Sequence, residues 1–321
     1  MRKIINKNKL VFGIIFVFVC SIVIPSSNST IINRSMTLEK NELYNRINYN
    51  DVWIVDDEGD GDFTSVQDAI DNAIEGDTIC VYSGIYYENV EIEKGKNNLN
   101  IIGYNEEYPP TGSDDFCPII HGDRTTNVIS AEDSNNIKID GFNITGSKLS
   151  GEIGGIYLRN CEHCVISNNK VWDNYYGIYF DYTDNTGIWL NNVALNEMSG
   201  IVLVNSHRNL ISHNHAENNG WNGMITDGAR LNIITFNSFS YNTHNGLKIW
   251  QDSFSTPACN SVRYNNIVDN GEPDENCKSF TIWHNNWWGN TESFHIITGI
   301  PPKFDLNPAK FPFYIPLGKC I

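Results

Sequence analysis

Short runs of alternating apolar and polar residues recur through the middle of the chain, and a glycine opens each run. The run at residues 246–250, GLKIW, is one example. Alternation with a period of two residues indicates a β-strand that buries one face. The pattern therefore predicts a series of similar short strands. The residues expected to point inward are Ile156 and Leu158, Ile178 and Phe180, Ile201 and Leu203, Met224 and Thr226, and Leu247 and Ile249.

The runs return with a fixed period. Their glycines are 22 or 23 residues apart, and two series of asparagines keep a similar spacing. A shared period in this range indicates a repeat architecture. Asparagine tolerates a left-handed backbone at bends, and its amides can hydrogen-bond along a column, so we interpret the asparagines as structural corner residues. The three series are Gly155, Gly177, Gly200, Gly223 and Gly246; Asn169, Asn192, Asn214, Asn237 and Asn266; and Asn174, Asn196, Asn219, Asn242 and Asn270.

The repeat length selects the type of solenoid. The repeats contain β-prone runs without helical periodicity, they lack the spacing of leucine-rich repeats, and they are too short for propeller blades of about 40 residues. We therefore predict an all-β, right-handed, single-stranded parallel β-helix of about ten coils. The second run of each repeat is expected to contribute the inward residues Ile166, Trp189, Ile211 and Ile234, followed by Val171, Ala194, Ala216 and Phe239.

The ends of the solenoid need caps. Thr64 and Gln67 form a capping box, and Gly76 stands where a helix would stop. An apolar stripe at helical spacing lies between them, which predicts a short N-terminal capping α-helix. We place the β-helix at residues 51–290 and an irregular, proline-rich tail at 291–321. The stripe consists of Val66, Ala69, Ile70, Ala73 and Ile74.

The first residues resemble an export signal. Four basic residues precede an uncharged apolar stretch at residues 10–24, which is typical of a signal peptide at 1–29. Residues 30–50 are expected to be a flexible leader. Removal of the signal takes the net charge from −16 to −20, and such acidity disfavours nucleic acid and anionic membranes as partners. No later segment is long and apolar enough to cross a membrane. We therefore predict a secreted or cell-surface protein.

Seven cysteines follow the predicted signal, so at least one has no partner within the chain. Cys161 and Cys164 flank His163 in a CxxC motif. This motif fits a metal site, or a turn that holds a disulfide or two free thiols, and a single CxxC without a second pair favours the turn. Cys259 and Cys277 flank one irregular coil and are the expected disulfide, with Cys320 as the rival partner.

Residues 56–105 resemble the opening of pectin-lyase-like right-handed β-helix proteins, and the start of pectin methylesterases is similar. The repeats and the sequence NNWWGN at 285–290 are similar to the NosD-type β-helix family and to repeats of prokaryotic surface proteins. The resemblance covers residues 51–290 and implies the fold, a link to polysaccharides and, through NosD, a periplasmic copper-related role. The motifs of pectin methylesterases, polygalacturonases, pectate lyases and alginate epimerases are missing. We find no Cys, His or Met spacing suited to copper, and we predict no metal and no other cofactor.

Candidate chemistry lies on the outward face of the glycine-led strands. Asp181 and Asp227 should lie two coils apart, at about 9–10 Å. Inverting glycosidases hold two carboxylates at about 6.5–9.5 Å, so these two are the candidate catalytic residues. A solvated surface of an acidic protein is the alternative interpretation. The candidate substrate-binding residues are Tyr157, Arg159, Tyr179, Lys248, Trp250 and Trp221.

Trp221 belongs to a second column just before the glycines, which could stack on sugar rings or on its own members. Its members are Tyr175, Met198, Trp221 and His244. The expected function is an exported β-helix repeat protein that binds an extracellular polysaccharide or cell-surface glycan, or that serves as a surface structural module. A polysaccharide hydrolase or lyase and a NosD-like metal-related accessory protein are the alternatives. The sequence leaves open whether the protein is an enzyme.

Overall fold

The computed structural model describes residues 51–104, 117–148, 150–250, 259–271, 275–277, 281–289, 295–297, 303–305, 308–318 and 320. The predicted signal peptide and leader lie outside these residues.

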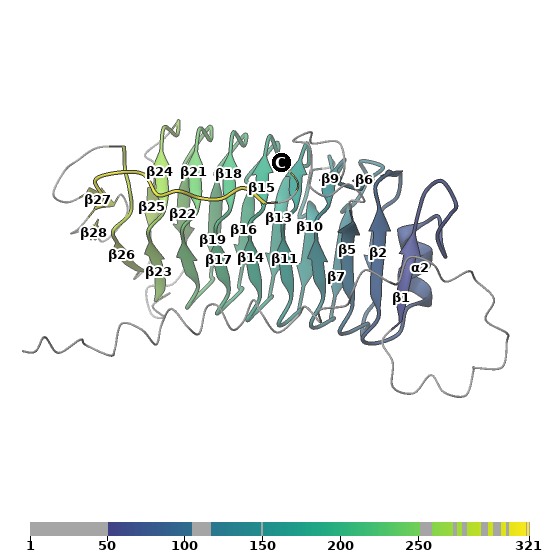
Figure 1. Cartoon of the computed structure of the whole chain (residues 1–321). Helices are drawn as coiled ribbons and strands as arrows, with labels where there is room; N and C mark the ends of the chain where they lie inside the picture. The colour runs from purple at the N-terminus through teal and green to yellow at the C-terminus, as the bar shows by residue number, and fades with distance from the viewer. Residues whose placement is uncertain are drawn as a thin grey trace, which may run out of the picture. The chain divides into compact units, whose positions relative to one another are not determined.

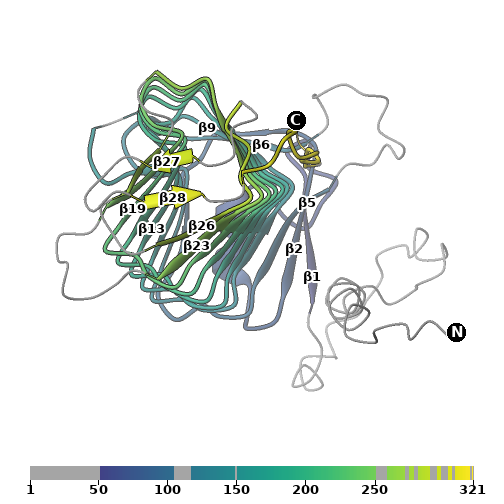
Figure 2. The same cartoon turned by 90° about the vertical axis from the view of Figure 1, so that its left-hand side faces the viewer.

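Three parallel sheets form the walls of a solenoid (Figures 1 and 2). Sheet A contains β1 (Val52–Val55), β2 (Thr78–Tyr82), β5 (Asn100–Tyr104), β8 (Lys138–Asp140), β11 (Val165–Ser167), β14 (Gly187–Trp189), β17 (Leu210–Ser212), β20 (Ile233–Thr235), β23 (Asn260–Arg263) and β26 (Thr281–His284). Sheet B contains β3 (Ile85–Tyr86), β6 (Ile119–His121), β9 (Asn143–Thr145), β12 (Lys170–Trp172), β15 (Asn192–Ala194), β18 (His215–Glu217), β21 (Ser238–Ser240) and β24 (Asn266–Val268). Sheet C contains β4 (Val90–Ile92), β7 (Ile129–Glu132), β10 (Gly154–Arg159), β13 (Tyr176–Asp181), β16 (Ile201–Val204), β19 (Met224–Asp227), β22 (Leu247–Trp250) and β25 (Glu275–Cys277).

The chain visits sheets C, A and B in turn, and each strand pairs in parallel with the equivalent strand one coil away. The predicted parallel β-helix is therefore confirmed. Its core is a set of vertical columns, such as the one formed by Ile156, Ile178, Ile201, Met224 and Leu247. All five side chains are fully buried.

The inward residues of the glycine-led strands are confirmed, but two predictions for the second run are wrong. Ile188 and Val193 are fully buried, whereas the predicted Trp189 and Ala194 lie on the outer face. The register pairs Ile166 with Ile188, a step of 22 residues, where the prediction assumed 23. Because side chains alternate along a strand, a slip of one residue exchanges the two faces.

The asparagines form buried ladders, which confirms their structural role. Asn214 Nδ2 donates to Asn237 Oδ1 at 3.0 Å and to the Ile188 carbonyl at 2.8 Å. The same pattern repeats on neighbouring coils. One ladder lies at the corner between sheets A and B and the other at the corner after sheet B. The members of the first are Asn169, Asn191, Asn214, Asn237, Asn265 and Asn286, and those of the second are Asn174, Asn196, Asn219, Asn242 and Asn270.

Two details of the asparagine prediction need correction. Asn192 and Asn266 begin strands β15 and β24, and the ladder positions are their predecessors. In addition, the left-handed backbone at the corner between sheets A and B belongs to the residue before the ladder asparagine, as at His213 with φ of 57°. The glycine series has a packing cause, because a Cβ at Gly177 would lie 2.3 Å from Val193 Cγ1.

The capping helix α2 (Val66–Asn72) lies beside β1 (Figure 1). Its N-cap is Ser65 and not the predicted Thr64: Ser65 Oγ accepts the Asp68 N–H at 3.2 Å. The helix also ends earlier than predicted, so that Ile74 is 55% exposed, whereas Val66, Ala69 and Ile70 are buried. In the part of the chain that the structure describes, no helix is both long and apolar enough to span a membrane.

At the other end, β27 (His295–Ile297) and β28 (Lys303–Asp305) form an antiparallel pair within the segment expected to be irregular. Residues 308–318, which we call the strap, contain no helix or strand. Figure 1 shows the strap running back over β24, β21, β18 and β15. A disulfide joins Cys117 and Cys320. The predicted Cys259–Cys277 disulfide is wrong, because Cys259 is a free thiol.

Candidate functional site

The outward face of sheet C has the register that the period predicted. One row contains Tyr157, Tyr179, Val202, Ile225 and Lys248, each opposite the next. The row two residues further along contains Arg159, Asp181, Val204, Asp227 and Trp250. Asp181 and Asp227 therefore lie two coils apart, with Val204 between them.

Four of the predicted site residues come together at β10 and β13. The rings of Tyr157 and Tyr179 stack with centroids 5.6 Å apart. Arg159 Nε lies 3.6 Å from Asp181 Oδ2. Burial raises the pKa of Tyr157 to about 12, with the Asp181 charge as a second cause. Burial also raises the pKa of Asp181, and Arg159 opposes that rise. The cluster thus contains a buried carboxylate whose ionisation is disfavoured, beside two packed aromatic rings.

The remaining predicted residues lie elsewhere. Lys248 Nζ stands 5.6 Å from the centroid of the Trp250 ring, so these two side chains contact each other three coils from Tyr179. Trp221 lies before β19 and stacks on His244 at 3.9 Å. Backbone bonds link the Tyr175, Met198, Trp221 and His244 column in steps of one coil. The predicted set is therefore divided among three places on sheet C and its edge.

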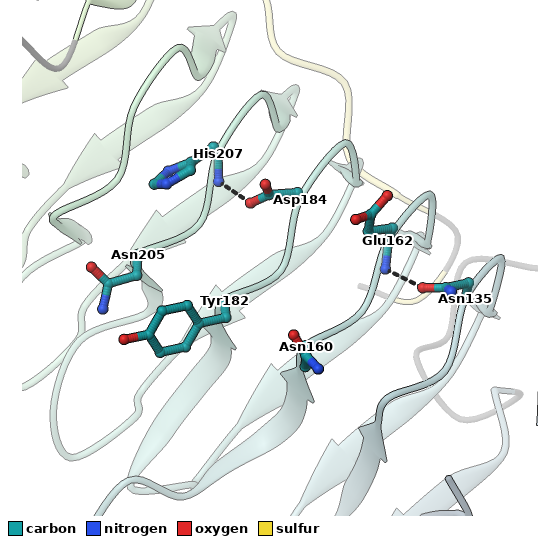
Figure 3. Close-up of a pocket in the computed structure, with 7 residues that line it drawn as sticks. All are labelled: Asn135, Asn160, Glu162, Tyr182, Asp184, Asn205 and His207. Atoms are coloured by element: carbon teal, nitrogen blue, oxygen red, sulfur yellow. Dashed lines mark hydrogen bonds between the residues drawn. The ribbon is translucent and has the colours of Figure 1, made fainter. Parts of the chain in front are cut away.

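A groove that the sequence did not reveal runs along the corner where sheet C turns into sheet A. This corner groove is a cavity of about 390 Å³, within the usual size range of ligand sites. Figure 3 shows its walls as two rows of polar side chains on neighbouring coils. One row holds Asn160, Tyr182 and Asn205, and the other holds Asn135, Glu162, Asp184 and His207.

The backbone of this corner explains why both rows face outward. Asn160, Tyr182 and Asn205 directly follow β10, β13 and β16, and their φ values are 54°, 48° and 46°. This left-handed conformation turns the chain sharply. The next residue on each coil, such as Thr183, is buried, so the residue after it, such as Asp184, projects outward again. Each coil therefore adds one side chain to each wall.

The second row is tied to its own backbone. Asn135 Oδ1 accepts the Glu162 N–H at 2.7 Å, and Asp184 Oδ1 accepts the His207 N–H at 2.6 Å (Figure 3). His207 Nδ1 accepts the Arg230 N–H at 3.2 Å. These bonds fix the wall while other atoms of the same groups still face the groove. The carboxylates of Glu162 and Asp184 are on directly opposed residues of adjacent coils.

The CxxC motif lies inside the same corner and not on its surface. Cys161 and Cys164 are buried free thiols. One coil further on, Thr183 and Thr186 take the same two inner positions: Thr183 Oγ1 and Thr186 Oγ1 accept the Cys161 and Cys164 N–H groups. A hydrogen bond between the thiols lowers the pKa of Cys161 and raises that of Cys164. The motif thus forms two rungs of an inner polar ladder, while His163 is exposed.

The groove and the cysteines do not make a metal centre. Within the described ranges, no three His, Cys, Asp or Glu side chains converge as metal ligands would. His207 accepts a backbone N–H, and His215 lies between Glu217 and the strap.

The groove residues escaped the sequence analysis because they share a position and not a residue type. Asn160, Tyr182 and Asn205 are each one residue past the outward row of sheet C. The available signal was their distance from the glycine that opens the coil, which places a polar residue directly after β10, β13 and β16.

The family model described as "Periplasmic copper-binding protein (NosD)" matches residues 70–300, more than two thirds of the chain. A cell surface glycoprotein of Methanothermus fervidus is 32% identical over 127 residues, which are 36% of this chain and 18% of the glycoprotein. The chain thus spans less than a fifth of that curated relative.

The crystal structure of the periplasmic alginate epimerase AlgG is similar in fold, with a TM-score of 0.51 and 15% identity. The match covers 67% of this chain and 51% of AlgG. At this identity the likeness shows the fold alone.

Proposed function

The chain belongs to the NosD family, and on that premise we propose that it is an exported surface protein that binds an extended polysaccharide in the corner groove. The groove is the observation that carries this proposal. The similarity to a cell surface glycoprotein and the predicted export signal support a place at the surface.

The groove suits a linear polymer because its walls repeat. Its lining residues come from four successive coils, which span roughly 14 Å along the solenoid at about 4.8 Å per coil. Each coil presents amide, carboxylate, phenol or imidazole groups, which donate and accept hydrogen bonds. A chain of hydroxyl-bearing sugar rings offers matching partners at regular intervals. A compact small molecule would leave most of this length unused.

The charges of the groove limit the kind of polysaccharide. Glu162 and Asp184 bring two carboxylates to one wall, and the chain as a whole carries a formal charge of −16. Arg208 Nη1 lies 4.0 Å from Asp184 Oδ2 and is largely exposed, so it screens that carboxylate only weakly. We therefore expect neutral polymers to bind better than uronic acid polymers.

Tyr182 provides a sharp test because the chain contains a matched control. Tyr182 and Tyr241 are 57% and 60% exposed, and both have a left-handed backbone, with φ of 48° and 57°. Asparagine suits this conformation, so Tyr182→Asn and Tyr241→Asn should both fold. We expect Tyr182→Asn to weaken retention of a bound neutral polysaccharide in affinity electrophoresis by about tenfold, the loss typical of one stacked aromatic ring. Tyr241→Asn should leave retention unchanged.

Equal weakening by both variants would contradict the groove as the binding site. If a panel of neutral, acidic and amino polysaccharides gives neither retention nor products, binding is refuted, and a purely structural module remains.

The buried state of Asp181 favours one second candidate, polysaccharide cleavage. A carboxyl whose pKa is raised by burial can act as a general acid, and Asp227 lies two coils away, at about 9–10 Å. This backbone spacing overlaps the upper end of the range of carboxyl separations in inverting hydrolases. The ion pair with Arg159 works against proton donation. Reducing-end release from the same panel tests this candidate: Asp181→Asn should abolish any turnover, and unchanged turnover would remove Asp181 from the mechanism.

No three His, Cys, Asp or Glu side chains of the described residues converge on a site for copper.

A further inference from the structure

The strap is attached to the solenoid through its backbone. Asn266 Nδ2 donates to the Phe313 carbonyl at 2.9 Å, and Asn266 Oδ1 accepts the Phe313 N–H at 2.8 Å. The Phe313 ring stands edge-on to Phe236 and Tyr264, with centroids 5.9 and 5.7 Å away. One asparagine and two rings therefore hold the middle of the strap at the corner between sheets A and B.

Two coils away from Asn266, a titratable group contacts the strap. His215 of β18 lies with Nε2 3.1 Å from the Ile315 carbonyl oxygen and Nδ1 3.4 Å from Glu217 Oε1. Glu217 Oε1 also accepts the Ser238 hydroxyl at 2.5 Å. A neutral imidazole can donate from only one nitrogen, whereas the protonated ring donates from both. Only protonated His215 can therefore satisfy the strap carbonyl and the carboxylate together.

A disulfide joins Cys320, beyond the strap, to Cys117, so the strap stays tethered at this end whether or not its other contacts hold. We propose that the strap is a pH-controlled clasp, which the His215–Glu217 pair closes under mildly acidic conditions and loosens above neutrality, while the disulfide retains it. Loosening at Ile315 leaves Asn266 and the rings of Phe236 and Tyr264 as the hold on the strap. The proposal is independent of any glycan in the corner groove, which lies on a different corner.

The groups around His215 set the direction of the pH effect. Burial lowers the pKa of His215, but the Glu217 carboxylate and the carbonyls of Ile315 and Pro316 outweigh it and raise the pKa above the ordinary 6.5. Ser238 of β21 stands opposite His215 and adds no charge. A raised folded pKa contributes stability that is complete below the unfolded value and lost as the pH rises through the folded value.

Glu217 sets the lower limit of the range. Burial raises its pKa, but His215 and Ser238 outweigh burial and bring the pKa below the ordinary 4.5. A lowered folded pKa contributes stability above the unfolded value that is lost as the pH falls through the folded value. The clasp should therefore be closed most firmly between about pH 4.5 and 6.5, where Glu217 is ionised and His215 is protonated.

Hydrogen exchange of the full chain tests the clasp. The reporter is a peptide covering residues 308–318, with rates corrected for intrinsic exchange, at pH 5.5 and pH 8.0. We expect roughly tenfold greater protection at pH 5.5, the effect of one hydrogen bond to a charged group. In His215→Gln, protection should be the same at both pH values. Protection of β13 serves as the internal reference for intact coils.

His213→Gln is the matched control, because His213 is two residues away and stacks on Phe236 at 5.3 Å without a bond to the strap. It should retain the tenfold ratio. In Glu217→Gln, as in His215→Gln, protection of the strap should be the same at both pH values. The second variant keeps the test valid if one of the two fails to fold. Equal protection of the native strap at both pH values, or an unchanged ratio in both His215→Gln and Glu217→Gln, would overturn the proposal.

Discussion

Two corners of the solenoid use the same backbone device for different ends. At the corner between sheets A and B, a left-handed residue precedes an inner asparagine on six coils, and the strap covers the outside. At the corner between sheets C and A, a left-handed residue precedes an inner side chain that changes from coil to coil, and the outside is an open groove. These inner side chains are Cys161, Thr183, Ser206 and Ala229.

The difference lies in how strictly each turn fixes the type of its inner residue. In the asparagine ladder every amide binds its neighbour and the backbone, so no member can change without leaving buried polar groups unpaired. In the other corner, Ala229 takes the place of a polar residue without loss of the fold. The same corner has a buried ladder of its own at Asn209, Asn232 and Asn260, directly before sheet A. The turn that tolerates a change of inner residue is therefore the one directly after sheet C, and it is the turn that lines the open groove.

The largest expected effect is on the ladder. Asn237→Ala removes a fully buried amide that accepts the Asn214 N–H and donates to the Ile211 carbonyl. We expect the free energy of unfolding to fall by about 3–5 kcal/mol, because several buried groups lose their partners. Urea unfolding measures this. Ser206→Ala, which copies Ala229, is the control and should cost about 1 kcal/mol. Equal losses of unfolding free energy in the two variants would show that the ladder asparagine is no more restrictive than the inner residue after sheet C.

A smaller effect, of opposite sign, is expected beside the groove. Burial raises the folded pKa of Asp181, so its contribution to stability is present at low pH and lost as the pH rises through that pKa. Asp181→Asn should therefore increase the free energy of unfolding at pH 7. The increase should be at most about 1 kcal/mol, because the substitution also removes the ion pair with exposed Arg159. The gain should vanish below about pH 3.8. A stability loss at pH 7 would instead indicate that the ion pair dominates.

The smallest effect is expected for the cysteines. Because Thr183 and Thr186 take the equivalent positions one coil on, the double variant Cys161→Thr and Cys164→Thr should fold with a change within about 0.5 kcal/mol. Urea unfolding and the metal content after copper exposure would be measured together. A large destabilisation would contradict the ladder role of the thiols, and a loss of bound copper would reveal a site that the described geometry does not contain.

The walls of the solenoid were predictable because their period is carried by residue types with one physical task. Gly177 recurs in phase because Val193 leaves no space for a Cβ, and Ile178 and Phe180 recur in apolar type because they fill the core. The slip at Trp189 arose where one coil is a residue shorter. Gly155 and Gly177 are also 22 residues apart, so the glycine series, followed strictly, places Ile188 in phase with Ile166.

The groove and the disulfide were not predictable on the same basis. Tyr182 and Asn205 share a backbone conformation and a position, which a comparison of residue types does not detect. Cys320 lies beyond the repeats, and Cys117 follows a stretch without repeat phase, so no register argument brings them together. The outward strip on sheet C was placed in the right register, but its residues are split among three local contacts.

The Cys117–Cys320 bond joins residues 203 apart in the sequence and so closes a ring that contains most of the coils. Tension applied to the chain on either side of this ring would pass through the sulfur atoms and bypass the hydrogen-bonded walls. Unravelling of the enclosed coils would otherwise release roughly 700 Å of extended chain. Under such tension the coils before Cys117 would therefore yield first, and the ring would keep its length.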